Sequence, residues 1–171
     1  MSGPVQSRQE LFDQVHRDYG EALNRIAACY VDQDADRLDL FQEILVAIWR
    51  ALPRFEGRSS LKTFVYRIAY NRGASYRVAS RRNRHSDLDM SISHPGPGPA
   101  ESLQTARRRA WLRDSIRRLP MPLRQAVMLR VDGLSNQEIA QVVGISEGNV
   151  AVRLSRAKKA LESLLNEDVA E

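Results

Sequence analysis

The side chains with the clearest chemical signature lie near the C-terminus, where polar and basic residues follow a predicted tight turn. Residues 135–138 form a capping box that opens one helix, and Ser146 caps a longer helix after Gly144. Counted from Ala140, glycine falls at +4 and Val150 at +10, which is the spacing of a helix-turn-helix. This motif places its second helix in the major groove of duplex DNA, with basic side chains near phosphates. The alternative is a helical hairpin that docks on a partner protein. The candidate DNA-contacting residues are Ser146, Glu147, Gly148, Asn149, Arg153, Arg156, Lys158 and Lys159.

Residues 61–84 form a second candidate nucleic-acid surface, because this predicted helix carries its tyrosines and arginines on one side. Tyr66 and Tyr70, four residues apart, are followed by arginines with the same spacing. This combination predicts a platform that stacks unpaired bases beside a strip that neutralises phosphates. The alternative is that both tyrosines cover a neighbouring helix while the arginines are solvated. The predicted face contains Lys62, Tyr66, Tyr70, Arg77, Arg81 and Arg84.

Residues 36–52 predict a third surface, in which acidic side chains surround an apolar contact. Leu40 and Ala47 are expected to be exposed among Asp36, Asp39 and Glu43. Charge that steers a partner and an apolar contact that holds it are typical of a protein-docking surface. Taken alone, these residues favour the plainer interpretation of a solvated helix face. The expected core stripe on the opposite side contains Leu38, Phe41, Leu45, Ile48 and Leu52.

Charge is distributed in blocks along the 171 residues. The net charge is +5, but residues 1–49 carry −5, residues 50–84 carry +9, residues 85–105 carry −3 and residues 106–171 carry +4. Two basic blocks separated by acidic ones indicate two contacts with a polyanion and an acidic surface that faces something basic. Solvated helix faces are again the alternative. Hydrophobic residues at 43% and charged residues at 27% exclude a disordered chain.

The periodicity of apolar residues is helical throughout, and we find no convincing alternating strand pattern. Residues 94–99 read His-Pro-Gly-Pro-Gly-Pro, which cannot continue a helix or a central strand. The sequence therefore predicts an all-α fold of two small helical domains, residues 1–84 and 106–171, joined by a flexible linker at residues 85–105.

Composition also predicts where the protein acts. No stretch approaches the roughly 20 apolar residues of a membrane span, and the best run covers only residues 44–49. The N-terminus does not resemble a secretory signal, and the single Cys29 cannot form an internal disulfide. We therefore expect a cytoplasmic protein without membrane insertion.

The order and spacing of these features resemble the extracytoplasmic-function (ECF) group of bacterial sigma factors, over about residues 11–165. In the first domain the matching residues are Asp39-Leu40-Phe41-Gln42-Glu43, Trp49-Arg50-Ala51-Leu52-Pro53-Arg54-Phe55, Ser60, Thr63, Tyr66-Arg67-Ile68-Ala69-Tyr70-Asn71 and Arg81-Arg82. In the second domain they are Leu119-Pro120, Arg124, Leu134-Ser135, Glu138-Ile139-Ala140, Gly144-Ile145-Ser146-Glu147-Gly148-Asn149-Val150 and Arg153-Leu154-Ser155-Arg156-Ala157.

The resemblance implies that the first domain is sigma region two. Its acidic helix would dock on the clamp helices of the largest subunit of core RNA polymerase. Its third helix, with the loop at residues 55–60, would open and hold the −10 promoter element, and Asn71 would help to hold a flipped base. The implied polymerase-binding residues are Asp36, Asp39, Leu40, Gln42 and Glu43. The implied −10 residues are Lys62, Thr63, Tyr66, Arg67, Tyr70, Asn71, Arg77 and Arg81.

The resemblance also implies that the second domain is sigma region four. This domain would read the −35 promoter element as duplex DNA and contact the flap region of the polymerase, while the linker threads toward the RNA exit. A protein of this group catalyses no bond chemistry and needs no metal or cofactor. Most relatives are held inactive by a partner protein, often an anti-sigma factor.

Two other classes of function fit part of the sequence. An ordinary helix-turn-helix regulator would bind a two-fold symmetric DNA site without polymerase, with half-sites about one helical turn apart. An enzyme would need a site that the sequence does not offer, because no histidine has metal-ligand partners at useful spacing and no glycine-rich phosphate loop is present. A Mg²⁺ ion could in principle be held by Asp36, Asp39 and Glu43, but no phosphate-binding loop accompanies them.

Overall fold

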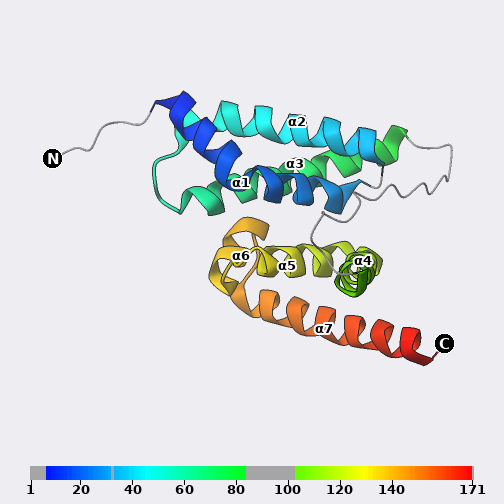
Figure 1. Ribbon diagram of the computed structural model, residues 1–171. Coiled ribbons are helices and arrows are strands. Elements are labelled where there is room, and N and C mark those ends of the chain that lie inside the picture. The colour runs from blue at the N-terminus through cyan, green and yellow to red at the C-terminus, as the bar shows by residue number, and fades with distance from the viewer. Residues whose placement is uncertain (1–6, 32, 84–102, 171) are drawn as a thin grey trace. The chain divides into compact units, whose positions relative to one another are not determined.

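The computed structural model describes residues 7–31, 33–83 and 103–170, and within these ranges it contains α-helices and one short 3-10 turn but no strand (Figure 1). The prediction of an all-α fold is confirmed. Contacts divide the chain into two compact units, the first centred on α1–α3 and the second on α4–α7. The elements are α1 (Arg8–Tyr30), α2 (Asp34–Ala51), η1 (Leu52–Arg54), α3 (Leu61–Asn83), α4 (Leu103–Arg118), α5 (Met121–Val131), α6 (Asn136–Val143) and α7 (Glu147–Ala170).

The first unit is a bundle of three helices, in which each of α1, α2 and α3 packs against the other two. Residues Ser7-Arg8-Gln9-Glu10 form a capping box that opens α1, because Ser7 Oγ accepts from the Glu10 amide at 3.2 Å and the Ser7 amide donates to Glu10 Oε2 at 2.8 Å. The start of α1 is tied to the end of α2 by Arg8, which donates to the Trp49 carbonyl and lies 3.9 Å from the centroid of the Trp49 ring. The fully buried core contains Val15, Leu23, Ile26, Leu40, Ile44, Ile48, Val65 and Ala69.

The core side of α2 differs from the predicted one. Leu40 is 0% exposed and Leu38 is 56% exposed, so the predicted exposure of Leu40 and the predicted burial of Leu38 are both wrong. The helix packs between α1 and α3, and its core stripe is therefore the i, i+4 row of Leu40, Ile44 and Ile48. Of the other predicted core residues, Ile48 and Leu52 are buried as expected, and Phe41 and Leu45 are half-buried.

The second unit consists of α4–α7, with α5 packed along α7 and α4 in contact with both. Its buried residues include Ile116, Leu119, Ala126, Leu129, Leu134, Ile139, Val150 and Ala157. Because α4 begins at Leu103, residues 103–105 of the predicted linker are helical. The prolines and glycines of the linker lie outside the described residues. Among the helices that the structure describes, none is long and apolar enough to cross a membrane.

Candidate nucleic-acid and protein interfaces

The helix-turn-helix of the second unit is built from short-range contacts that the sequence predicts. Ser135 Oγ accepts from the Glu138 amide at 3.2 Å, and the Ser135 amide donates to Glu138 Oε2 at 2.8 Å, which completes the capping box of α6. Gly144 ends α6 in the left-handed region, with φ 75° and ψ 39°, and its amide donates to the Ala140 carbonyl at 2.9 Å. This conformation favours glycine and turns the chain into α7.

The first turns of α7 present the predicted DNA-contacting side chains to solvent. Ser146 Oγ accepts from the Asn149 amide at 3.2 Å, so the helix begins with a capped and ordered turn. Lys158 pairs with Glu162 at 3.8 Å, whereas Arg156 and Lys159 form no ion pair with any residue that the structure describes. The exposed candidates are Ser146, Glu147, Gly148, Asn149, Arg156, Lys158 and Lys159, and Arg153 is half-buried.

The tyrosines of α3 do not form a stacking platform. Tyr66 is 2% exposed and Tyr70 is 3% exposed, so the prediction that they cover unpaired bases is wrong. Helix α1 covers this side of α3: the Tyr66 ring meets Tyr19 edge-on, with centroids 6.1 Å apart, and the Tyr70 ring meets Tyr30 at the same distance. Burial, with a smaller contribution from the Asp18 charge, raises the pKa of the Tyr19 hydroxyl above its ordinary value.

Thr63 is a second correction on α3. The side chain is 2% exposed, and its Oγ1 lies 2.9 Å from Ser60 Oγ, which also accepts from the Thr63 amide at 3.1 Å. Thr63 is therefore part of the N-terminal cap of α3 and not a surface contact for DNA.

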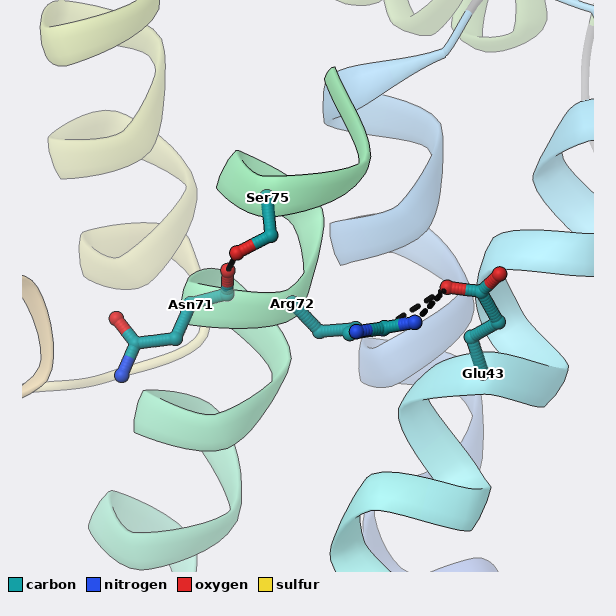
Figure 2. A network of polar contacts seen from close by, with 4 residues as sticks. All are labelled: Glu43, Asn71, Arg72 and Ser75. Carbon is teal, nitrogen blue, oxygen red and sulfur yellow. Dashed lines mark hydrogen bonds and ion pairs between the residues drawn. The ribbon is translucent and has the colours of Figure 1, made fainter. Parts of the chain in front are cut away.

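The solvent-facing row of α3 is centred on Asn71. Arg67 and Asn71 are exposed, and the exposed row continues with Ala74 and Val78, of which Val78 is 55% exposed. These four residues stand at positions i, i+4, i+7 and i+11 and therefore share one side of the helix. Ala74 and Val78 are not among the predicted contacts, although a helical projection centred on Asn71 places both on this side. In Figure 2 the Asn71 amide points away from α2, on the other side of α3 from Arg72. Of the other predicted −10 residues, Lys62 and Arg77 are half-buried, and the side chain of Arg81 lies outside the described residues.

The acidic side of α2 keeps its charged residues near the surface, but of its two predicted apolar contacts Leu40 is buried and Ala47 is half-buried. Asp39 and Gln42 are exposed, Asp36 and Glu43 are half-buried, and the fully buried Leu40 cannot touch a partner. Val46, at 47% exposed, is the apolar residue that this side offers instead. No three His, Cys, Asp or Glu side chains gather into a metal site in the described ranges, so the structure gives no support to the Mg²⁺ alternative.

An open groove of about 520 Å³ runs between α2 and α3 on this acidic side. Arg72 of α3 donates to Glu43 of α2 through Nε at 2.8 Å, and its Nη2 lies 2.7 Å from the same carboxylate oxygen (Figure 2). The residues that line the groove are Asp39, Gln42, Glu43, Val46, Ala47, Arg50, Arg72 and Tyr76.

Comparison with known proteins assigns both units to one class. The family model for sigma-70 region 2 matches residues 15–84, and the family model for sigma-70 region 4 matches residues 109–161. The first range covers the helices that carry the acidic groove and Asn71, and the second covers the helix-turn-helix. The fold and these surfaces therefore define a sigma factor.

Similarity to individual relatives shows to which group of sigma factors the chain belongs. The chain is 33% identical over 171 residues to the ECF RNA polymerase sigma-E factor of Escherichia coli K12, covering 91% of this chain and 86% of the relative. It is 31% identical over 167 residues to the RNA polymerase sigma-H factor of Pseudomonas aeruginosa, covering 90% and 86%. The chain belongs to the ECF sigma factors, the RNA polymerase sigma factors that the sequence analysis expected, and it functions in transcription initiation.

Solved structures agree with this fold. CnrH, in complex with the cytosolic domain of CnrY, has a TM-score of 0.65 and 27% identity, covering 92% of this chain and 88% of CnrH. The sigma factor RpoE of Bartonella quintana, in complex with the anti-sigma factor NepR, has a TM-score of 0.75 and 24% identity, covering 91% and 96%.

Proposed function

We propose that this sigma factor binds core RNA polymerase through α2, reads the −35 element as duplex DNA through α7 and holds the melted −10 strand on α3. The observation that carries the proposal is the helix-turn-helix, with its glycine at φ 75° and its exposed Arg156 and Lys159. In this proposal residues 1–84 form region two, residues 85–105 the linker and residues 106–171 region four. The protein performs no bond chemistry and acts in the cytoplasm.

Strand holding rests on the solvent-facing row of α3. Extruding a base from the duplex costs a few kcal/mol. With Tyr66 and Tyr70 buried, stacking on them cannot offset this cost. The compensation comes instead from phosphate contacts at Arg67, a base contact at Asn71 and the binding energy of the polymerase itself.

Polymerase docking uses the acidic side of α2, through Asp36, Asp39, Gln42 and Glu43, with Val46 in place of Leu40 as the apolar contact. The partner surface is the set of clamp helices of the largest subunit, and region four contacts the flap. We also propose a protein regulator such as an anti-sigma factor, because the similar CnrH is found in complex with the cytosolic domain of CnrY.

Multi-round transcription with purified core polymerase on a pool of genomic fragments tests the proposal. We expect the full chain to direct transcripts from asymmetric promoters, and to bind these promoters feebly without polymerase. Absence of any promoter-specific transcript would refute it. Specific binding without polymerase, to a site with half-sites about one helical turn apart, would favour the dimeric regulator instead.

The role of α7 is tested by the salt dependence of promoter binding by the holoenzyme. Replacing Arg156 with alanine should weaken binding to all promoters alike and reduce the slope of log K against log salt by about 1. Arg25→Ala on α1 is the matched control, because Arg25 is also an exposed arginine and should leave the slope unchanged. An unchanged slope for Arg156→Ala would remove Arg156 from the phosphate contacts.

A further inference from the structure

The ion pair between Glu43 and Arg72 leaves half of the carboxylate available. Two of the three guanidinium nitrogens of Arg72 converge on Glu43 Oε2, at 2.8 Å from Nε and 2.7 Å from Nη2. Glu43 Oε1 has no partner among the residues that the structure describes, and Figure 2 shows it turned away from Arg72. A carboxylate oxygen can accept further hydrogen bonds when its neighbour is occupied. The Glu43 side chain is thus held in one orientation with a free acceptor.

The pair also stands between two hollows on the same side of the first unit. The groove of about 520 Å³ has an apolar part at Val46 and Ala47 and a polar rim. A second hollow of about 380 Å³ continues along α3. Glu43, Arg72 and Tyr76 line both, so the ion pair lies where the two hollows meet.

Folding stability alone does not account for this arrangement. The Glu43 and Arg72 side chains are 40% and 46% exposed. An ion pair that is this accessible to solvent contributes little to the free energy of folding. An association, however, must order every flexible side chain that it uses, and a side chain that is already held saves that cost. A carboxylate positioned before binding is therefore more useful to an interface than to the bundle.

We propose that Arg72 is a positioning residue for polymerase docking, which holds Glu43 Oε2 so that Oε1 accepts from a basic group of core polymerase. The same polymerase element places an apolar side chain against Val46 and Ala47 in the groove. The docking surface then extends from α2 onto α3. This inference rests on the proposed function, in which the acidic side of α2 binds the polymerase.

The proposal places polymerase docking and promoter-strand holding on one turn of α3. Arg72 points to α2, and Asn71, the next residue in the chain, points away from it (Figure 2). Two neighbouring side chains on a helix are separated by about 100°, so they serve different partners without competing for space.

The test measures the dissociation constant of the full-length chain for core polymerase, together with the melting temperature. We expect Arg72→Ala to weaken polymerase binding roughly 3- to 10-fold, the cost of ordering one or two side chains, without lowering the melting temperature. Arg72→Lys should have a smaller effect. The control Arg25→Ala removes another exposed ion pair, with Glu21 at 4.0 Å, and should leave the affinity unchanged.

A charge swap separates positioning from stability. The double variant E43R/R72E restores an ion pair but places the carboxylate on α3, so we expect a normal melting temperature with weakened polymerase binding. Wild-type affinity for the swap would overturn the proposal, because any ion pair at this place would then suffice. Wild-type affinity for Arg72→Ala would overturn it too.

Two further variants distinguish this inference from the proposed function. If Asp39→Ala and Glu43→Gln both keep wild-type affinity, docking on α2 is refuted and the inference falls with it. If they weaken binding but Arg72→Ala does not, only the positioning role of Arg72 is refuted. Val46→Asp should weaken binding at least tenfold by placing a charge in the apolar part of the groove, and normal binding by this variant would refute the groove contact.

Discussion

Gly73 should be the position in α3 least tolerant of an added methyl group. A Cβ at this residue would lie 2.3 Å from Tyr30 Cδ2 and Cε2 and 2.8 Å from Cγ, where carbon atoms normally approach to about 3.5–4.0 Å. Tyr30 is 7% exposed, and its hydroxyl donates to the Tyr70 carbonyl at 3.1 Å. The ring must therefore retreat by about 1 Å or more, and its buried hydrogen bond is lost or stretched.

The magnitude follows from opposing contributions. Overpacking of this kind costs about 1–3 kcal/mol, and loss of one hydrogen bond costs about 0.5–1.5 kcal/mol. Alanine is more favourable than glycine inside a helix by about 1 kcal/mol, and this gain in stability offsets part of the cost. We therefore expect Gly73→Ala to lower the free energy of unfolding of the first unit by about 0.5–3.5 kcal/mol.

Urea denaturation followed by Trp49 fluorescence measures this change in the full chain. Trp111 lies in the second unit and is replaced by phenylalanine in the background protein, because the two units need not unfold together. Gly20→Ala is the matched control: it lies within α1 with nothing within 4 Å of the added Cβ, and should stabilise the unit by about 0.5–1 kcal/mol.

The decisive result is that the two substitutions change the free energy of unfolding in opposite directions, with Gly73→Ala lowering it and Gly20→Ala raising it. If Gly73→Ala stabilises the first unit as Gly20→Ala does, the close approach of Tyr30 to α3 is refuted. A second check replaces the Tyr30 ring with a smaller side chain. In a Tyr30→Leu background, the destabilisation by Gly73→Ala should become much smaller. Persistence of the full effect there would show that Tyr30 is not its cause.

Three further predictions concern the buried tyrosines and the local signals of the second unit. Tyr66→Ala should cost about 3–5 kcal/mol of stability in the same urea assay, because it removes a buried ring; lost promoter opening at unchanged stability would restore the stacking hypothesis. Gly144→Ala should cost about 1–2 kcal/mol, because an alanine is strained at a φ of 75°. No atom lies within 4 Å of the added Cβ, so the backbone conformation alone causes this cost. Gly144→Asn should cost less, and thermal melting compares the two. Ser135→Ala should cost about 1 kcal/mol through loss of the cap of α6, whereas Ser135→Thr keeps most of the stability in the same melts.

Features that depend on a few neighbouring residues could be predicted correctly from the sequence. The capping boxes at Ser7 and Ser135 and the left-handed Gly144 each involve contacts within four residues, and the structure confirms all three. Backbone conformation and capping are local properties, so the side chains that create them stand together in the sequence. The all-α fold follows for the same reason, because apolar periodicity is also local.

The direction in which each helix faces the core could not be predicted in the same way. The tyrosines of α3 and Leu40 of α2 were assigned to solvent, yet all three are buried. A helical projection shows which residues share a side, but it does not show how many neighbours cover the helix. Each helix of the first unit has two neighbours, so the buried arc is wider than a single apolar stripe, and amphipathic tyrosines fall inside it.

The order of residues along the chain was enough to establish the class of this protein, through helical periodicity, two capping boxes, a glycine turn and the spacing of basic residues along the last helix. These are properties of the chain over short distances, where conformational preference and capping dominate. Only the tertiary structure decided which side chains remain at the surface, turning Asn71 to solvent, Tyr66 into the core and Arg72 onto Glu43. These features depend on residues far apart in the chain, because the Glu43–Arg72 ion pair joins residues 29 positions apart and the Tyr30–Tyr70 hydrogen bond joins residues 40 positions apart, and such residues meet only when the helices pack.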